Sequence, residues 1–232
     1  MSQTLNKIIE KSIKTWEHSS TRKRSIVPES KKYPAITISR EFGAKGAKLA
    51  EYIGEKIGFK VWNRDILQAI AEKLESDEEY IESLDEIRRE TIEDVITGFM
   101  KNISTNDSYL RTLTQVIKTI EEHGNSLIVG RGANYICDNT DSLHVRVVSP
   151  LKKRAADYAS GNEISKGKAL EIIQKTDQER AEFIQYSFNK DVNNSSDYDL
   201  ILNSGTFVLH DMMLIILEAY ERKTGITLKI LN

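Results

Sequence analysis

Short runs of apolar and β-branched residues recur along the chain, and stretches with helical spacing separate them. Five of these runs predict strands, at residues 35–39, 59–62, 126–129, 143–148 and 199–203. Apolar residues recur every three or four positions between them, which predicts helices over 47–57, 151–158, 166–189 and 207–224 and nearly throughout 64–124. Strands alternating with helices predict an α/β fold, in which one sheet of about five parallel strands is flanked by helices and joined by right-handed crossovers.

The sequence predicts one main domain with an insertion and additions at both ends. We expect the domain to span residues 35–224, with a helical insertion at 66–124 and a tail at 225–232. Residues 1–34 read as an arm, because an amphipathic pattern over 1–18 is followed by a polar linker that holds two of the three prolines. Two roles fit this arm. It packs on the domain or on a second copy of the chain, or it touches nucleic acid through its basic residues.

Composition and charge narrow the class of protein. An apolar content of 39% over 232 residues with three prolines excludes a disordered or fibrous chain, and a single cysteine, Cys137, excludes a disulfide scaffold and fits a reducing compartment. The net charge of −2 speaks against bulk binding to nucleic acid, although residues 1–34 hold eight basic and three acidic residues. No run approaches the roughly 18 apolar residues of a membrane span, and charges interrupt the apolar runs of the N-terminus. We therefore expect a soluble cytoplasmic protein.

The loop after the first strand has the chemistry of a phosphate site. Ligands of open α/β sheets bind beyond the carboxyl ends of the strands. Gly43 and Gly46 lie in a turn that opens a helix, where unpaired backbone N–H groups and the helix dipole favour an anion. Arg40, Lys45 and Lys48 add positive charge. The full GxxxxGK[ST] pattern is absent, so an ordinary strand-to-helix turn with solvated lysines fits this loop equally well.

Other strand ends carry further candidates. Arg131, flanked by two glycines after the third strand, is placed to hold a phosphate with its fork of donors. Asn63 and Arg64 follow the second strand, where a helix cap is an equally good interpretation. Arg154 and Arg180 lie in helical stretches with acidic neighbours, a pattern that taken alone is typical of a solvated face. The histidines and the cysteine have no metal-ligand spacing, and no GxSxG or HExxH motif is present.

Together these segments resemble the cytidylate kinase-like family, a branch of the nucleoside monophosphate kinases, over about residues 33–224. Residues 37–46 are similar to the family's ISRxYGSGG loop, and 62–65 stand where the family has a Tyr-Asp-Arg-type turn. Residues 129–133 match its GRGA turn, and 177–180 match the D-x-x-R signature of its lid helix. The order and spacing of the four segments make the resemblance more specific than any one of them.

The resemblance implies transfer of the γ-phosphoryl group of ATP to a nucleoside monophosphate or a similar small acceptor, with Mg²⁺. Arg131 would hold the acceptor phosphate, and Arg40, Asn63 and Arg64 would face the acceptor. Lys45, Arg154 and Arg180 would act on the transferring group. Residues 66–124 would bind the acceptor, and residues 151–190 would form a lid. The residues that would cradle the donor phosphates are Gly43, Ala44, Lys45, Gly46, Ala47 and Lys48.

Departures from the family pattern leave alternatives open. Compared with a loop of the GPSGAGKGT kind, Gly46 stands at the position of the phosphate-binding lysine, and Lys48 at that of the hydroxyl that binds Mg²⁺. Asn63 replaces an acidic residue at the acceptor side. A non-catalytic nucleotide sensor on the same fold is therefore one alternative. A protein that binds nucleic acid or a partner through residues 1–34 is another.

Overall fold

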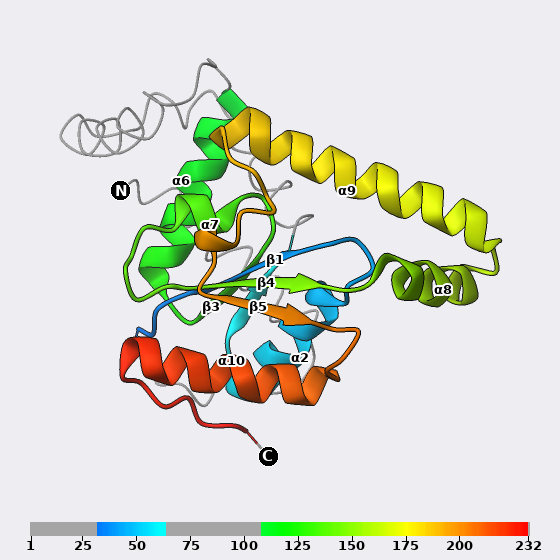
Figure 1. Cartoon of the computed structure of the whole chain (residues 1–232). Coiled ribbons are helices and arrows are strands. Elements are labelled where there is room, and N and C mark those ends of the chain that lie inside the picture. Colours follow the sequence, from blue (N-terminus) through cyan, green and yellow to red (C-terminus); the bar gives the residue numbers. More distant parts are fainter. Residues whose placement is uncertain (1–31, 64–107, 232) are drawn as a thin grey trace, which may run out of the picture.

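The computed structural model describes residues 32–63 and 108–231 (Figure 1). Within these residues five strands form one sheet, in the order β2-β3-β1-β4-β5, and every neighbouring pair is parallel. This confirms the predicted α/β fold with five parallel strands. Because β1 lies in the middle, the loop that follows it emerges between the carboxyl ends of β3 and β4. The strands are β1 (Ile36–Arg40), β2 (Lys60–Trp62), β3 (Ser126–Val129), β4 (Leu143–Val148) and β5 (Leu200–Asn203).

Helices cover both faces of the sheet and extend beyond one end of it. Figure 1 shows α6 and α7 on one face, α2 and α10 on the other, α8 beyond the arrowheads of the strands, and α9 running from beside α8 back to α6. Helix α8 and the start of α9 therefore lie at the edge where the strands end, and the last residues of α9 pack in the core with α6 and α7. The described helices are α2 (Gly46–Ile57), α6 (Ser108–His123), α7 (Ala133–Ile136), α8 (Leu151–Asn162), α9 (Lys166–Phe188), α10 (Leu209–Thr224) and the 3₁₀ helix η1 (Ser195–Asp197).

Two hydrophobic cores follow from the alternation of side chains along the strands. Leu127 and Val129 of β3 belong to the core between the sheet and helices α2 and α10, whereas Ile128 belongs to the core under α6 and α7. Successive residues of a strand point to opposite faces, so a strand buried on both faces is apolar throughout. The consecutive apolar residues of the predicted strands have this origin.

The observed elements differ from the sequence-based prediction in their ends and in two short helices. The first strand runs to residue 40 instead of 39, and α8 continues to residue 162 instead of 158. The helices α7 and η1 were not predicted, because four and three residues are too few to show helical periodicity. Among the described residues no helix is long and apolar enough to cross a membrane.

Several predicted parts fall outside the described residues. The arm up to residue 31 and the part of the predicted insertion 66–124 that ends at residue 107 are among them, so an oligomer formed through the arm stays a prediction. The rest of that predicted insertion is described and contains α6. The C-terminal tail is described up to residue 231. It packs on the domain, because Leu228 is buried and the Leu231 N–H donates to the carbonyl of Lys56 at 2.6 Å.

Candidate functional site

The loop after β1 turns sharply into α2 and leaves the helix start open. Gly43 and Lys45 have φ angles of +78° and +64°, and the helix begins at Gly46. No side chain caps it, and the first N–H with an intrahelical acceptor belongs to Leu49, which donates to the Lys45 carbonyl at 2.9 Å. Within the described part of the chain the backbone N–H groups of residues 46–48 have no acceptor. They lie at the positive end of the helix dipole, which suits an anion.

A buried arginine clamps this loop. Arg154 of α8 is 5% exposed and uses all three guanidinium nitrogens. Its Nε donates to the Ser149 carbonyl at 2.9 Å, and its Nη1 donates to the Phe42 carbonyl at 2.9 Å. The same Nη1 donates to Asp177 Oδ2 at 2.5 Å, and Nη2 lies 3.4 Å from Glu41 Oε2. In this arrangement Arg154 holds the loop in place, because all three nitrogens of its guanidinium contact protein groups.

Two carboxylates complete the clamp from opposite sides. Asp177 of α9 accepts from the Phe42 N–H through Oδ1 at 2.6 Å, and Glu41 accepts from the Ser149 N–H at 2.9 Å. The backbone of Phe42 is therefore held at both ends, by Asp177 at its N–H and by Arg154 at its carbonyl. Charge-assisted hydrogen bonds of this kind are about twice as strong as neutral ones. The loop is thus preorganised without any ligand.

Arg180 contacts the same loop from one turn further along α9. Its Nη1 donates to the carbonyl of Arg40 at 3.0 Å, and its guanidinium lies 5.4 Å from the centre of the Phe42 ring. Residues three apart on a helix share a face, so Asp177 and Arg180 both reach the end of β1. Arg154 and Arg180, which by the family resemblance would act on the transferring group, contact the loop after β1 and the end of β1, respectively.

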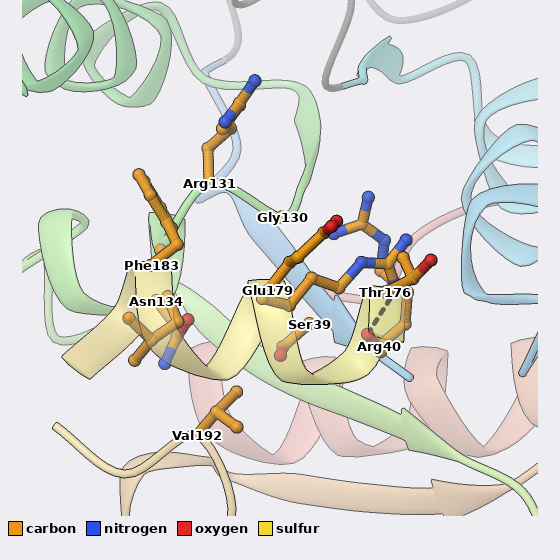
Figure 2. A pocket seen from close by; sticks show the side chains of 12 residues that line it. Ser39, Arg40, Gly130, Arg131, Asn134, Thr176, Glu179, Phe183 and Val192 are labelled. Atoms are coloured by element: carbon orange, nitrogen blue, oxygen red, sulfur yellow. Dashed lines mark hydrogen bonds between the residues drawn. The ribbon is translucent and has the colours of Figure 1, made fainter. Parts of the chain in front are cut away.

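A cavity with three arginines lies beside the loop (Figure 2). Arg40 comes from the end of β1, Arg131 from the turn after β3, and Arg180 from α9. Glu179 is the one acidic residue among the described residues that line the cavity. An excess of guanidinium groups over carboxylates favours an anionic ligand. The lining residues are Ser39, Arg40, Gly130, Arg131, Gly132, Asn134, Thr176, Glu179, Arg180, Phe183, Ile184 and Val192.

Arg131 lies at a different end of this cavity from Arg40. Figure 2 shows its side chain pointing away from Arg40. Its guanidinium lies 5.9 Å from the centre of the Tyr109 ring, on α6, and 5.6 Å from that of Phe183, on α9. Arginine stacks on aromatic faces through cation–π attraction. Arg131 is thus held in a fixed orientation by two rings.

The glycines beside Arg131 serve other residues. A Cβ at Gly130 would lie 2.0 Å from Nη1 of Arg40, and a Cβ at Gly132 would lie 2.1 Å from the ring of Phe188. An arginine and a phenylalanine from elsewhere in the chain therefore lie against the backbone at these two glycines.

A second hollow lies on the other side of the start of α2. It combines three lysines, Lys45, Lys48 and Lys153, with the loop between β5 and α10. In that loop Phe207 is 40% and Val208 63% exposed. Ammonium groups next to exposed apolar surface suit a ligand with a flat apolar part and negative charge. The sequence pattern placed residues 207 and 208 in a helix, so this loop was not predicted as part of a site, although α10 begins only at Leu209.

A buried cation behind the cavity was also missed. Arg146 of β4 is 6% exposed and donates to Ser39 Oγ and to Asn193 Oδ1, both at 3.1 Å. Its guanidinium lies 5.5 Å from the centre of the Tyr198 ring. Within the described residues it has no carboxylate partner. Its charge therefore adds to the positive field of the cavity that Ser39 lines.

The remaining predicted residues lie at the margin of the described structure. Asn63 follows β2, two strands away from β1, and is half-buried. Arg64 lies outside the described residues. Gly43 and Ala47 are exposed at the loop, while Ala44 is buried beneath it.

Comparisons with known proteins found one matching family model and several distant relatives. The model of the cytidylate kinase-like family matches residues 35–206. The cytidylate kinase of Archaeoglobus fulgidus is 27% identical over 194 residues, which cover 81% of this chain and 95% of that protein. The uronate isomerase of Corynebacterium glutamicum is 22% identical over 188 residues, which cover 80% of this chain and 36% of that protein, so the chain spans about a third of this longer relative.

Similarity to a solved structure supports the fold. An uncharacterized protein from Eubacterium ventriosum superposes with a TM-score of 0.64 at 19% identity, and the match covers 82% of this chain and 99% of that one. The matched family region, residues 35–206, contains the loop after β1, the turn after β3 and the D-x-x-R segment of α9. With these three segments gathered at one edge of a five-stranded parallel sheet, the chain belongs to the cytidylate kinase-like family.

Proposed function

We propose that the protein transfers the γ-phosphoryl group of ATP to a nucleoside monophosphate or a similarly small acceptor. The observation that carries this proposal is the open start of α2, where the N–H groups of residues 46–48 have no acceptor in the described part of the chain while the preceding loop is clamped by Arg154 and Asp177. Membership of the cytidylate kinase-like family supports it. Phosphoryl transfer asks a protein chiefly for positioning and charge neutralisation, and a preorganised loop with arginines around it provides both.

The donor nucleotide fits the loop and the second hollow. The N–H groups of residues 46–48 would bind its phosphates, and Lys45 and Lys48 would add positive charge from the rim. The exposed ring of Phe207 would lie against the base. This assignment uses the mixture of ammonium and apolar groups that the hollow presents.

The acceptor fits the opposite side of the loop. Arg131, held between two aromatic rings, would bind the acceptor phosphate, and Asn63 and Arg64 would face the acceptor from the end of β2. Arg180 lines the first cavity and contacts the end of β1, where a transferring group would pass. Its guanidinium would neutralise charge that develops during transfer.

The described residues do not fit a Mg²⁺ ion bound by the protein itself. Lys48 stands at the position expected for a hydroxyl ligand, and the carboxylates of Glu41 and Asp177 are occupied by Arg154 and by backbone N–H groups. No group of three or more His, Cys, Asp or Glu residues suited to a metal occurs in the described ranges. We therefore derive no step through a protein-bound metal.

The test is a transfer assay with labelled ATP and a panel of mononucleotides, nucleosides and sugar phosphates. We expect a labelled product with at least one phosphate-bearing acceptor. Binding of ATP without any labelled product would favour the nucleotide sensor, for which the glycine at position 46 is the motivating observation. Absence of both binding and transfer would contradict the proposal. Filter binding of nucleic acid with and without residues 1–34 tests the alternative role of the arm.

A further inference from the structure

The side chain of Arg40 lies against the backbone of two glycines, where a residue with a Cβ would come too close to it. A Cβ at Gly46 would lie 2.7 Å from Cβ and 3.0 Å from Cγ of Arg40. A Cβ at Gly130 would lie 2.0 Å from its Nη1 and 2.8 Å from its Cζ. Real Cβ atoms essentially never lie below about 3.0 Å from other atoms, so the stem of Arg40 requires glycine at 46. At position 130 a Cβ would force the guanidinium to shift, and the φ of +79° also favours glycine there.

Compared with a loop of the GPSGAGKGT kind, the glycine and the cationic residue have exchanged positions at 40 and 46. In that comparison Arg40 takes the place of the first glycine, and Gly46 takes the place of the lysine. A lysine at 46 would collide with the stem of Arg40, so the two positions are sterically linked. The long cationic side chain that such a loop carries at the start of its helix is carried here by the last residue of β1.

The other cations of the loop point elsewhere. Lys45 is 43% exposed and lies 3.4 Å from Asp157 of α8, and both Lys45 and Lys48 line the second hollow. Arg40 lines the first cavity together with Arg131 and Arg180 (Figure 2). Of the three cations in the segment 40–48, Arg40 alone lines the first cavity, which we assign to the acceptor.

We propose that Arg40 makes the cationic contact to the transferring phosphates that a lysine makes in other loops of this kind. The inference rests on the proposed function, and it gives Arg40 a catalytic role instead of the acceptor-facing role that the family resemblance implies. A guanidinium presents a planar fork to two phosphate oxygens, which a single ammonium does not. Gly130 leaves the space in which this fork lies.

The test compares Arg40→Gln, Arg40→Lys and Arg222→Gln with the wild type. Arg222 on α10 is 81% exposed and paired with Glu218, so it is a matched control for loss of an arginine. For each variant, calorimetry gives the affinity for ATP, the labelled-ATP assay gives the transfer rate, and thermal melting gives the stability. We expect Arg40→Gln to lower ATP affinity about tenfold and the transfer rate by about 10²-fold or more. Arg40→Lys should fall between it and the wild type, and Arg222→Gln should match the wild type.

An exchange variant separates a phosphate contact from a structural role. Arg40→Gly removes the guanidinium, and the double variant Arg40→Gly/Gly46→Lys returns a cation from the opposite position, where the stem of Arg40 no longer blocks it. Recovery of ATP affinity in the double variant relative to Arg40→Gly supports the proposal, because a purely structural arginine would not be rescued in this way.

Two results would overturn it. If Arg40→Gln binds ATP and transfers the phosphoryl group as well as the wild type does, Arg40 does not touch the phosphates. In that case the activity of the wild type would still support the proposed function. A lower melting temperature with unchanged ATP affinity would show that Arg40 is structural. If the wild-type protein binds no ATP, the proposed function fails first and this inference falls with it.

Discussion

Asp177 serves the loop after β1 with both of its carboxylate oxygens. Oδ1 accepts from the Phe42 N–H at 2.6 Å and Oδ2 from Arg154 at 2.5 Å. A neutral amide can replace the first contact, but it cannot balance the charge of a guanidinium that is 5% exposed. The aspartate of the D-x-x-R segment therefore fixes the loop backbone and at the same time balances the charge of Arg154.

We predict that Asp177→Asn loosens the loop and destabilises the fold. The loss should be about 1–3 kcal/mol, below the value for a fully buried pair, because the Asp177 side chain is 27% exposed. Chemical denaturation measures it, and calorimetry should show weaker ATP binding in the same variant. Glu171→Gln, at an exposed pair with Lys168, is the control and should change neither quantity. Equal stability of Asp177→Asn and wild type would contradict the clamp.

Arg180 should matter for transfer more than for stability. It is half-buried, and its hydrogen bond to the Arg40 carbonyl is one of the contacts that hold the end of β1. We expect Arg180→Ala to lower the transfer rate by about 10³-fold, as for other arginines that stabilise charge in phosphoryl transfer. The control is Lys175→Ala on the same helix, where the side chain is 80% exposed. Unchanged turnover in Arg180→Ala would reject the assignment.

At the scale of elements, the turn from β3 into α7 depends on a glycine that packs against α9. Gly132 has a φ angle of +67°, and a Cβ there would lie 2.1 Å from the Phe188 ring. We expect Gly132→Ala to lower the free energy of unfolding by about 1–3 kcal/mol through strain and overpacking. Gly161→Ala in α8, where a Cβ meets nothing within 4 Å, should instead raise it by about 0.5–1 kcal/mol. If Gly132→Ala is as stable as the wild type, the Phe188 ring of α9 can move aside without cost, which would contradict this account.

Strand β1, strand β4 and the residue before β5 are linked through a half-buried histidine. The Nδ1 atom of His144 on β4 lies 2.9 Å from the Thr37 hydroxyl, and the backbone N–H of His144 donates to Asp199 Oδ2 at 2.7 Å. Burial lowers the pKa of His144, and Lys223 lowers it further, while Asp199 and Glu121 act in the opposite direction. The unfolded chain therefore binds a proton more readily than the folded chain does.

Stability should accordingly fall when the pH drops below the ordinary histidine pKa of 6.5. The histidine contributes stability above that value, and the contribution is lost as the pH falls toward the lower pKa of the folded state. Melting temperatures between pH 8 and pH 5 measure the effect. His144→Asn keeps a polar partner for Thr37 without a titrating group, so its profile should be flatter. Identical profiles for the two proteins would contradict this account.

Sequence patterns predicted the sheet well and the site in part. Apolar runs marked all five strands, because strands buried on both faces leave a clear signal. Glycines marked the turns at 43 and 130, but the pattern could not tell what each glycine accommodates, since Arg40 lies 90 residues from Gly130 in the sequence. The clamp of Arg154 was hidden for the same reason, because its partners come from three separate segments.

At the scale of the whole molecule, the start of α2 lies between two hollows of different chemistry. On one side are three lysines with exposed apolar residues, and on the other are three arginines. Helices α8 and α9 reach across the carboxyl edge of the sheet and hold the loop between the hollows. Under the proposed function, this placement would give donor and acceptor separate compartments that meet at one set of backbone N–H groups, as in-line phosphoryl transfer needs.

The most direct measurement is a crystal structure of the protein with bound ADP. The account predicts that the diphosphate lies within about 3 Å of the backbone nitrogens of residues 46–48, at ordinary hydrogen-bond distance, with the Arg40 guanidinium on the same phosphates and the base near Phe207. ADP bound elsewhere, with no phosphate on the backbone N–H groups at the start of α2, would contradict it.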